Sequence, residues 1–272
     1  WGSSFLFVKL TNGEISPFAL AACRGLIGTA ALAAYFVWRG MDLRPRREEV
    51  VHWIVLGMSN GWLPNILLAY AMTQIGSGLG AMIQASGPLM IAALAPLFFQ
   101  EERLTPRRAL GVLVGFAGMA VLIGPKAFGG GSLMGALAMV AIAACYAAGN
   151  LYVRAIPKLD PVRLAFGQQL FSGAPALALA LAVGGASAFA PALDHAAALI
   201  ALGVLATAAP LALFMRLIQE AGPVRASMVG YLQPVIATLL GVAFLAETIG
   251  PREFLGGAIV LAGVALVTWQ RR

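Results

Sequence analysis

The chain has 272 residues, of which 60% are hydrophobic and only 11% are charged, and its mean hydropathy is +0.87. Soluble domains carry about 25% charged residues, so this composition excludes an ordinary soluble protein and indicates one membrane domain in a lipid bilayer. The net charge of +7 would suggest a nucleic-acid partner in a soluble protein. Here the arginines lie in short loops between apolar runs, where they orient membrane proteins, so no nucleic-acid partner is expected.

Apolar segments of membrane-spanning type follow one another along the chain, so the predicted fold class is an all-α membrane protein with ten transmembrane helices. The first segment is too short to cross a bilayer, and we interpret it as the end of a helix that starts before Trp1. Pro17 and Pro161 lie at predicted helix starts, where the missing N–H of proline costs nothing. The predicted spans are 1–12, 16–38, 50–73, 78–100, 107–125, 132–156, 161–184, 194–219, 224–246 and 251–270.

Lysine and arginine are distributed unevenly between the two sides that these spans define. The chain has 18 of them, and a cytoplasmic N-terminus leaves 14 on the inner side and four on the outer side. The four are Lys9, Arg24, Lys126 and Arg252. Because basic residues favour the cytoplasmic side of a membrane protein, the N-terminus and the C-terminus are both predicted to be cytoplasmic.

The segment from Gln84 to Leu122 has a second copy in the segment from Gly230 to Val267. A repeat of this length is half a protein, so residues 1–128 and 132–272 are predicted to form two five-helix repeats. Five is an odd number of spans, so the second repeat is inverted in the membrane, and inverted repeats around a shared site are a known basis for alternating access. The matched pairs include Gly57 with Gly203, Pro64 with Pro210, Pro88 with Pro234, Glu102 with Glu247 and Gly111 with Gly256.

Four of these matched residues are prolines inside predicted spans: Pro64, Pro88, Pro210 and Pro234. A proline inside a helix leaves the carbonyl four residues earlier without its helical partner, and within a membrane that carbonyl must be buried in protein or face water. We therefore expect helix kinks around one central cavity, formed by the third, fourth and sixth to ninth spans. Bends that serve only helix packing are the alternative.

Neutral polar side chains gather near these prolines and in the sixth and seventh spans. Amides and hydroxyls that line a cavity can hydrogen-bond the ammonium and carboxylate groups of an amino acid, whereas the alternative for each is a bond to a neighbouring helix. Arg24 could pair with a substrate carboxylate, but its long side chain is expected instead to reach the outer headgroups. Lys9, near a helix end, is interpreted as a membrane anchor. The predicted substrate-binding residues are Asn60, Asn65, Tyr70, Gln84, Ser86, Tyr146, Asn150, Gln168, Tyr231, Gln233 and Arg24.

An ordered set of residues, rather than any single motif, resembles the EamA-type members of the drug/metabolite transporter superfamily. The set comprises Trp1-Gly2-Ser3-Ser4 with Lys9, Pro17 and Arg24, then Gly87-Pro88 with Glu102 and Gly111, and the repeated Pro234, Glu247, Gly256 and Gly263. The resemblance implies ten helices, alternating access, and the export of amino acids or other small metabolites across the bacterial inner membrane. The second half departs from the first at two places, with Tyr146 in place of Trp1 and Gln168 near the place of Arg24.

The predicted function is therefore the export of amino acids, aromatic and other neutral ones, by a secondary transporter and not by an enzyme. An exporter of quaternary drugs or phosphorylated metabolites is the alternative, although phosphate would need several basic residues and the cavity offers only Arg24. A membrane-embedded enzyme would need clustered titratable residues, and a channel would need a continuous polar lining. The sequence has neither pattern.

No cofactor and no metal are expected. His52 and His195 lie at span edges without a matching array of cysteines or carboxylates, and Cys23 and Cys145 stand alone in apolar segments. Glycines in the fifth and tenth spans have the spacing of close helix packing. Packing within the chain is the favoured interpretation and dimerisation the alternative, so both a monomer and a homodimer stay open. The glycines are Gly111, Gly115, Gly118, Gly256, Gly257 and Gly263.

Overall fold

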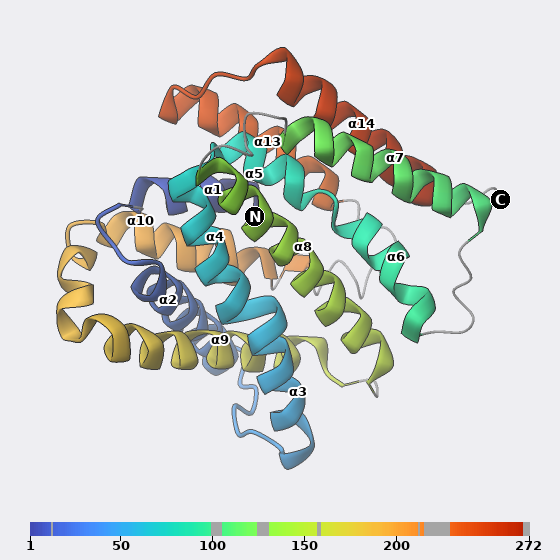
Figure 1. The fold of residues 1–272 in the computed structure, drawn as a ribbon. Coiled ribbons are helices and arrows are strands. Elements are labelled where there is room, and N and C mark those ends of the chain that lie inside the picture. Colours follow the sequence, from blue (N-terminus) through green and yellow to red (C-terminus); the bar gives the residue numbers. More distant parts are fainter. Residues whose placement is uncertain are drawn as a thin grey trace.

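The computed structural model describes residues 1–11, 13–98, 105–123, 131–156, 159–211, 213–214 and 229–268. Within these ranges the regular elements are all helices, as Figure 1 shows. By length and composition, three of them are suited to crossing a membrane, and a bent pair would make a fourth if it is one span. The three are Pro17–Trp38, Leu133–Val153 and Val162–Gly184, and the bent pair joins Ala186–Ala192 to Ala196–Leu211. The predicted all-α class is confirmed for the described residues, while the count of ten spans stays a prediction.

The first half of the chain folds into α1 (Gly2–Thr11), α2 (Pro17–Trp38), α3 (Arg47–Gly57), η1 (Met58–Trp62), α4 (Leu63–Gln74), α5 (Ser77–Gln84), α6 (Gly87–Phe98) and α7 (Pro106–Ile123). Ser16 caps α2, because its Oγ accepts a hydrogen bond from the Ala19 N–H at 3.2 Å, and Pro17 occupies the first helical position. The element η1 is a π-helical turn that joins α3 to α4. The predicted third span is thus one interrupted helix, and the predicted fourth span is divided between α5 and α6.

The second half contains α8 (Gly131–Ala155), α9 (Pro161–Gly184), η3 (Ala186–Ala192), α10 (Ala196–Ile200), η4 (Ala201–Ala208), α13 (Val229–Leu245) and α14 (Pro251–Thr268). Asp160 caps α9, since its Oδ1 accepts hydrogen bonds from the N–H groups of Val162 at 2.8 Å and Arg163 at 3.0 Å. The element η4 is π-helical and continues directly from α10. The helix boundaries that proline and capping residues predict are therefore close to those observed.

Three of the four matched prolines follow a widening or a break of their helix. Pro64 comes just after η1, in which Gly61 has non-helical backbone angles (φ −121°, ψ −109°), and Pro210 comes just after η4. Pro88 is the second residue of α6, after the interruption at 85–86. Pro234 lies within α13, which runs without interruption. A π-helical turn suits the residues before a proline because its hydrogen bonds reach five residues back, past the carbonyl that proline leaves unpaired.

Two side-chain hydroxyls donate hydrogen bonds to backbone carbonyls of η4. Pro210 leaves the Ala206 carbonyl without its usual helical partner, as the sequence predicts, and the Ser4 hydroxyl donates to that carbonyl at 3.2 Å. The Thr207 hydroxyl donates to the Leu202 carbonyl at 2.7 Å. A backbone group inside a membrane protein needs such a partner. The turn before Pro210 therefore brings two hydroxyls, from α1 and η4, into one place.

Two pairs of helices approach closely through glycine: α2 with α9, and α7 with α14. Figure 1 shows α7 and α14 running side by side. A Cβ added to Gly263 would lie 2.5 Å from the Gly115 nitrogen, and one added to Gly25 would lie 2.5 Å from the Gly173 Cα. Small residues allow this approach between membrane helices. Glycines of the predicted fifth and tenth spans thus pack against each other within the chain.

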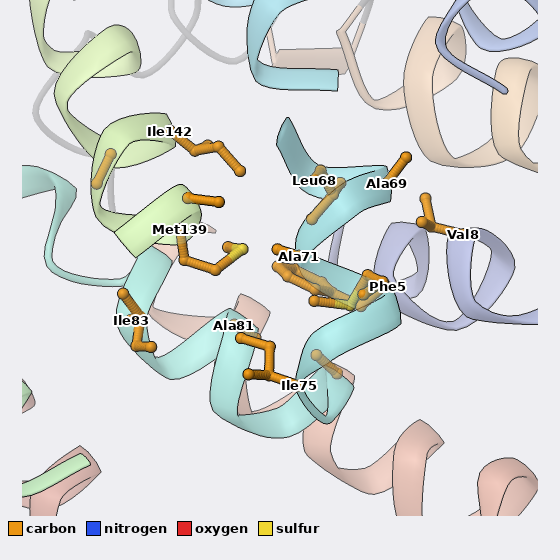
Figure 2. Close-up of a cluster of buried hydrophobic side chains, with 14 of the residues drawn as sticks. Phe5, Val8, Leu68, Ala69, Ala71, Ile75, Ala81, Ile83, Met139 and Ile142 are labelled. Carbon is orange, nitrogen blue, oxygen red and sulfur yellow. The ribbon is translucent and has the colours of Figure 1, made fainter. Parts of the chain in front are cut away.

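A buried apolar cluster joins α1, α4, α5 and α8, and Figure 2 shows it in close-up. Phe5 comes from α1, Leu68 from α4, Ile83 from α5 and Met139 from α8. Phe5 and Leu68 also line the cavity that is described in the next subsection. The cluster therefore supports one wall of that cavity.

Replacing Gly25 with Val is expected to push α2 away from α9 and to destabilise the protein by more than about 2 kcal/mol. The added side chain would meet backbone atoms of Ser172 and Gly173, which cannot move aside as a flexible side chain would. Thermal unfolding in detergent measures the effect. Ala30→Val, at an exposed position of the same helix, is the control and should stay within about 0.5 kcal/mol. Equal unfolding of the two variants would contradict a close helix contact at Gly25.

Candidate functional site

A cavity of about 320 Å³ lies between helices from both halves of the chain. Small-molecule sites typically measure about 300–1,000 Å³, so this cavity has the size of a site for one small ligand. Its polar lining residues are Ser4, Arg24, Asn60, Asn65, Gln84, Tyr146, Asn150, Gln168, Gln169, Thr207 and Gln233. Its apolar lining includes Trp1, Phe5, Leu68, Ile91, Leu211 and Phe214.

Eight of the eleven side chains that the sequence nominates for substrate binding line this cavity. The eight are Arg24, Asn60, Asn65, Gln84, Tyr146, Asn150, Gln168 and Gln233. Tyr70 and Ser86 do not belong to the lining, and the side chain of Tyr231 lies outside the described residues. The structure therefore brings most of the nominated residues together, from seven different helical elements of the two halves.

The two nominated residues outside the lining have other surroundings. Tyr70 lies on α4 with 37% of its surface exposed, whereas Ser86 is fully buried at the break between α5 and α6. The Ser86 carbonyl accepts hydrogen bonds from the N–H groups of Leu89 and Met90, so Ser86 starts the first turn of α6. The π-helical turn in the predicted third span and the break in the predicted fourth span change how the second part of each span is rotated relative to its first part. Sequence spacing alone could not separate these residues from the cavity-lining ones.

The cavity also includes helices that sequence reasoning did not assign to it. The sequence predicts a cavity formed by the third, fourth and sixth to ninth spans. In the structure, α1 also contributes Ser4 to the lining and α2 contributes Arg24. Ser4 and Thr207 were not nominated, because small hydroxyl residues are common in helices, where they bond the backbone. Only Thr207 has a signal in the sequence. It lies in the turn before Pro210, where the proline leaves a backbone carbonyl without its helical partner.

Arg24 is held inside the cavity wall, with only 7% of its surface exposed. Its Nε donates a hydrogen bond to Thr207 Oγ1 at 2.9 Å, and its Nη2 donates to Ser4 Oγ at 3.4 Å. Its Nη1 has no partner among the described residues. The expectation that Arg24 reaches the outer headgroups is therefore wrong, because hydroxyls from α1 and η4 hold the guanidinium inside.

Several amide groups in the lining have an oxygen without a hydrogen-bond partner in the described part of the chain. These buried oxygens are Asn60 Oδ1, Gln84 Oε1 and Gln169 Oε1. Gln84 donates through Nε2 to Gln233 Oε1 at 3.4 Å, which ties α5 to α13. Buried polar atoms are normally paired, so unpaired acceptors in a cavity are the groups that a ligand would satisfy. Trp1 and Phe214 pack edge to face, with ring centroids 5.1 Å apart, and form an aromatic part of the wall.

The sequence profile of the EamA-like transporter family matches residues 1–124 and 133–269. The chain belongs to the EamA-like transporter family. This is a family of transporters and not of enzymes, so the predictions of transport and of no enzymatic activity are confirmed. It also confirms the predicted multi-pass membrane fold in its general form.

Relatives of this EamA-like transporter occur in bacteria, archaea and plants. The uncharacterized inner membrane transporter YedA of Escherichia coli (strain K12) is 24% identical, over 98% of this chain and 87% of the relative. A chloroplastic WAT1-related protein of Arabidopsis thaliana is 26% identical, over 99% of this chain and 67% of the relative. A solved crystal structure, 22% identical in sequence, matches with a TM-score of 0.65. The match covers 97% of this chain and 94% of the chain in that structure. That likeness supports the overall fold.

Away from the cavity, one ionic cluster of the EamA-like transporter joins α1, α5 and the loop between α13 and α14. Lys9 Nζ lies 3.1 Å from Glu247 Oε1 and donates to the Ile75 carbonyl at 3.0 Å. Glu247 Oε2 accepts from the Ser77 hydroxyl at 2.6 Å, and both its oxygens accept from the Ser77 N–H. Burial would raise the pKa of Glu247, but the bonds from Ser77 and Lys9 outweigh it and hold that pKa below its usual value. Lys9, interpreted from sequence as an anchor, is thus an ion-pair partner.

A second ionic cluster joins the start of α3 to the start of α9. Arg163 forms a two-pronged contact with Glu49, Nε to Oε1 and Nη2 to Oε2, each at 2.7 Å. The same guanidinium also donates to the Asp42 and Arg44 carbonyls of the loop between α2 and α3. Both partners are buried. This cluster fixes two helix starts that the sequence assigns to the inner side.

Proposed function

We propose that this EamA-like transporter exports neutral amino acids, including aromatic ones, across a bacterial inner membrane by alternating access. The chemistry of the cavity lining carries the proposal. An amino acid has a carboxylate, an ammonium group and an uncharged side chain. The cavity offers the unpaired Nη1 of Arg24, three unpaired amide oxygens and a partly aromatic wall. These three features match the three parts of such a substrate.

Within the family, the ordered residues from Trp1 to Gly263 resemble the bacterial aromatic amino acid exporter YddG, and this resemblance supports an aromatic substrate. The walls formed by Trp1, Phe5, Tyr146 and Phe214 would accept an aromatic ring. An uncharged aliphatic side chain would fit the same walls. We therefore propose a range of neutral amino acids rather than one substrate.

Two inverted five-helix repeats, residues 1–128 and 132–272, are part of the proposal, and helix contacts support them. The matched residues Gly57 and Gly203 pack in matching ways: a Cβ on Gly57 would lie 2.5 Å from Phe171 Cβ, and one on Gly203 would lie 2.6 Å from Ile27 Cβ. Phe171 stands as many residues after Pro161 as Ile27 stands after Pro17. The π-helical turns η1 and η4 also precede matched prolines. Contacts that exchange in this way are expected of two repeats related by a two-fold axis.

The ionic clusters support the proposed ten-span topology. Lys9, Ser77 and Glu247 fall at the outer ends of the first, fourth and ninth predicted spans, and they meet in one cluster. Glu49 and Arg163 both fall at inner ends, and they form the other cluster. An error of one span between these residues would have assigned contacting groups to opposite sides. Cytoplasmic termini follow from the charge distribution, and the inner membrane is proposed from the name of the Escherichia coli relative.

Flux into proteoliposomes tests this function. We expect uptake of labelled neutral amino acids, such as L-phenylalanine and L-leucine, that saturates and is reduced by unlabelled competitors. Saturation indicates a carrier, because binding to a limited number of sites precedes transport. A quaternary ammonium compound and a phosphorylated sugar belong to the panel as the alternative substrate classes. Transport of either of these in preference to every amino acid would contradict the proposal, and rapid ion flux without saturation would indicate a channel.

Two variants in the same assay test the cavity as the transport site. Gln84→Met keeps the approximate side-chain volume but removes the amide, and we expect its KM for L-phenylalanine to rise roughly 10-fold, as for the loss of one hydrogen bond to a charged group. Tyr70→Phe is the matched control, because Tyr70 lies outside the cavity lining. Unchanged kinetics are expected for it. An equal effect of both changes would contradict this location of the site.

A further inference from the structure

Arg24 places a positive charge in the cavity that the described lining residues do not balance. No acidic side chain is among the described residues of the lining, and only 7% of Arg24 is exposed. A buried charge is costly unless it is paired, and in a membrane protein such a residue marks a substrate or ion pathway. A ligand with a negative group would supply the missing partner.

Two hydroxyls orient the guanidinium, and they can act toward it only as acceptors. Each hydroxyl has one proton. Thr207 uses its proton on the Leu202 carbonyl at 2.7 Å and accepts from Arg24 Nε at 2.9 Å. Ser4 uses its proton on the Ala206 carbonyl at 3.2 Å and accepts from Arg24 Nη2 at 3.4 Å. Pro210 is the origin of this arrangement, because it leaves the Ala206 carbonyl unpaired and is preceded by the π-helical turn that contains Thr207.

The remaining nitrogen, Nη1, has two N–H donors and no partner among the described residues. With Nε and Nη2 bonded to Thr207 and Ser4, the guanidinium plane is fixed from two sides. A fixed, planar donor suits a planar carboxylate acceptor. The side chain is therefore prepared for a ligand oxygen before the ligand arrives, which reduces the entropy cost of binding.

The second repeat has no copy of this arrangement. Three matched pairs identify the equivalent positions: the offset from Pro17 to Pro161 gives Gln168 for Arg24, the offset from Pro64 to Pro210 gives Gly61 for Thr207, and the offset from Trp1 to Tyr146 gives Gly149 for Ser4. Among the described lining residues, a charged anchor thus exists on one side of the cavity. One guanidinium balances one carboxylate, whereas a phosphate group of nearly two negative charges would keep an uncompensated charge.

We propose that Arg24, positioned by Ser4 and Thr207, anchors the carboxylate of the substrate, and that transport requires this carboxylate. The inference rests on the proposed amino acid export and specifies how the substrate is recognised. The ammonium group of the same substrate would lie toward the unpaired oxygens of Asn60, Gln84 and Gln169. Amines and amides of the same side chain therefore bind poorly, since they keep the positive charge and lack the carboxylate.

Competition experiments with four probes that share one aromatic ring test the anchor. L-Phenylalanine has both charged groups, 3-phenylpropionate keeps only the carboxylate, and L-phenylalaninamide and phenethylamine keep only the ammonium. In proteoliposomes with the wild-type protein, the amide and the amine should inhibit phenylalanine uptake roughly 10- to 100-fold more weakly than L-phenylalanine itself, as for one lost charged hydrogen bond. 3-Phenylpropionate should inhibit more strongly than either. Equal inhibition by all four probes would overturn the inference.

Variants of Arg24 and Thr207 are the second part of this test. Arg24→Gln should raise the KM for L-phenylalanine roughly 10- to 100-fold and remove the preference for probes with a carboxylate. Arg24→Lys keeps the charge but has no fork of donors, so it should recover part of that preference. Thr207→Val removes one positioning hydroxyl and should raise KM with little change in the maximal rate. Arg39→Gln removes an exposed positive charge elsewhere and serves as the control with unchanged kinetics. Arg24→Gln with an unchanged order of probes would also overturn the inference.

The proposed function and the anchor can fail separately. Saturable phenylalanine uptake with no dependence on Arg24 would leave amino acid export standing and remove the anchor. If no amino acid is transported, the anchor is tested by ligand-induced thermal stabilisation of the purified protein with 3-phenylpropionate and phenethylamine. Stabilisation by the carboxylate alone, lost in Arg24→Gln and retained in part by Arg24→Lys, would support the anchor. The anchor would be overturned if 3-phenylpropionate does not stabilise the wild-type protein, or if it stabilises the wild type and Arg24→Gln equally.

Discussion

Replacing Glu49 with Gln should destabilise the transporter by about 2–3 kcal/mol, because it leaves the buried guanidinium of Arg163 without its counter-charge. Glu49 is 2% exposed, and its two oxygens each lie 2.7 Å from a nitrogen of Arg163. Breaking a buried pair costs about 3–5 kcal/mol in general. Here the loop that covers the pair is exposed, and the Asp42 and Arg44 carbonyls of that loop also accept hydrogen bonds from Arg163. Because these bonds remain in the variant, we expect a value below that range.

Denaturant or thermal unfolding in detergent measures this effect. Glu14→Gln is the matched control, because Glu14 also pairs with a side chain far along the sequence, His195, at 2.8 Å but is 68% exposed. Exposed pairs contribute only about 0–1 kcal/mol, so the control should unfold almost as the wild type does. A Glu49 variant as stable as the Glu14 variant would show that water reaches the pair in solution.

The same pair predicts how stability depends on pH. Hydrogen bonds from the Arg163 guanidinium hold the pKa of Glu49 below its usual range, although burial acts in the opposite direction. Because the pKa of the folded state is the lower one, the stabilisation is complete above the ordinary glutamate value of about 4.3. It is lost as the pH falls through the lowered pKa of the folded state. The Glu49→Gln variant should lack this part of the acid destabilisation, and an identical acid slope in both proteins would contradict the assignment.

Much of the fold was available from the sequence, for identifiable reasons. Apolar length predicted the helices, proline and capping residues such as Ser16 and Asp160 predicted their starts, and the repeat singled out the prolines near the cavity. These signals are local, or they recur at a fixed offset. The Glu49–Arg163 contact joins residues 114 positions apart, and charge counting could assign the two to one side but could not pair them.

The candidate site was predictable as a group of residues, but its electrostatic centre was not. The sequence predicts amides near the matched prolines as binding residues because a neutral polar group in a membrane needs a partner, and most of these amides do line the cavity. For Arg24 the sequence predicts a side chain that reaches the headgroups, because a long cationic side chain near an outer helix end normally does. Its actual position depends on Ser4 and Thr207, which come from two distant helices. No spacing rule relates these three residues.

The second large effect is expected from Glu247→Gln, which should favour the state in which the proposed outer end of the transporter is open. Glu247 belongs to the second half of the chain, while Lys9 and Ser77 belong to the first, so their cluster bridges the two proposed repeats. Alternating access requires the repeats to separate at one end at a time, and this bridge must then break. A neutral amide loses the ion pair and the bonds that only a carboxylate accepts, a loss of about 1–2 kcal/mol. That energy corresponds to a shift of roughly 5- to 30-fold in the ratio of the two states.

Labelling of a single cysteine can detect this shift. A cavity of about 230 Å³ lies beside the cluster and is lined by Lys9, Thr238 and Glu247 among others, so Thr238→Cys reports whether this end opens. Cys23 and Cys145 are first replaced by Ala. The rate of reaction with a membrane-impermeant maleimide should rise roughly 5- to 30-fold when Glu247→Gln is added, and Lys9→Met should act in the same direction because it breaks the same bridge. Glu14→Gln, which disrupts a more exposed pair on the same side, should leave the rate unchanged. If Glu247→Gln lowers stability without changing the labelling rate, the cluster holds the fold together and does not control access to the cavity.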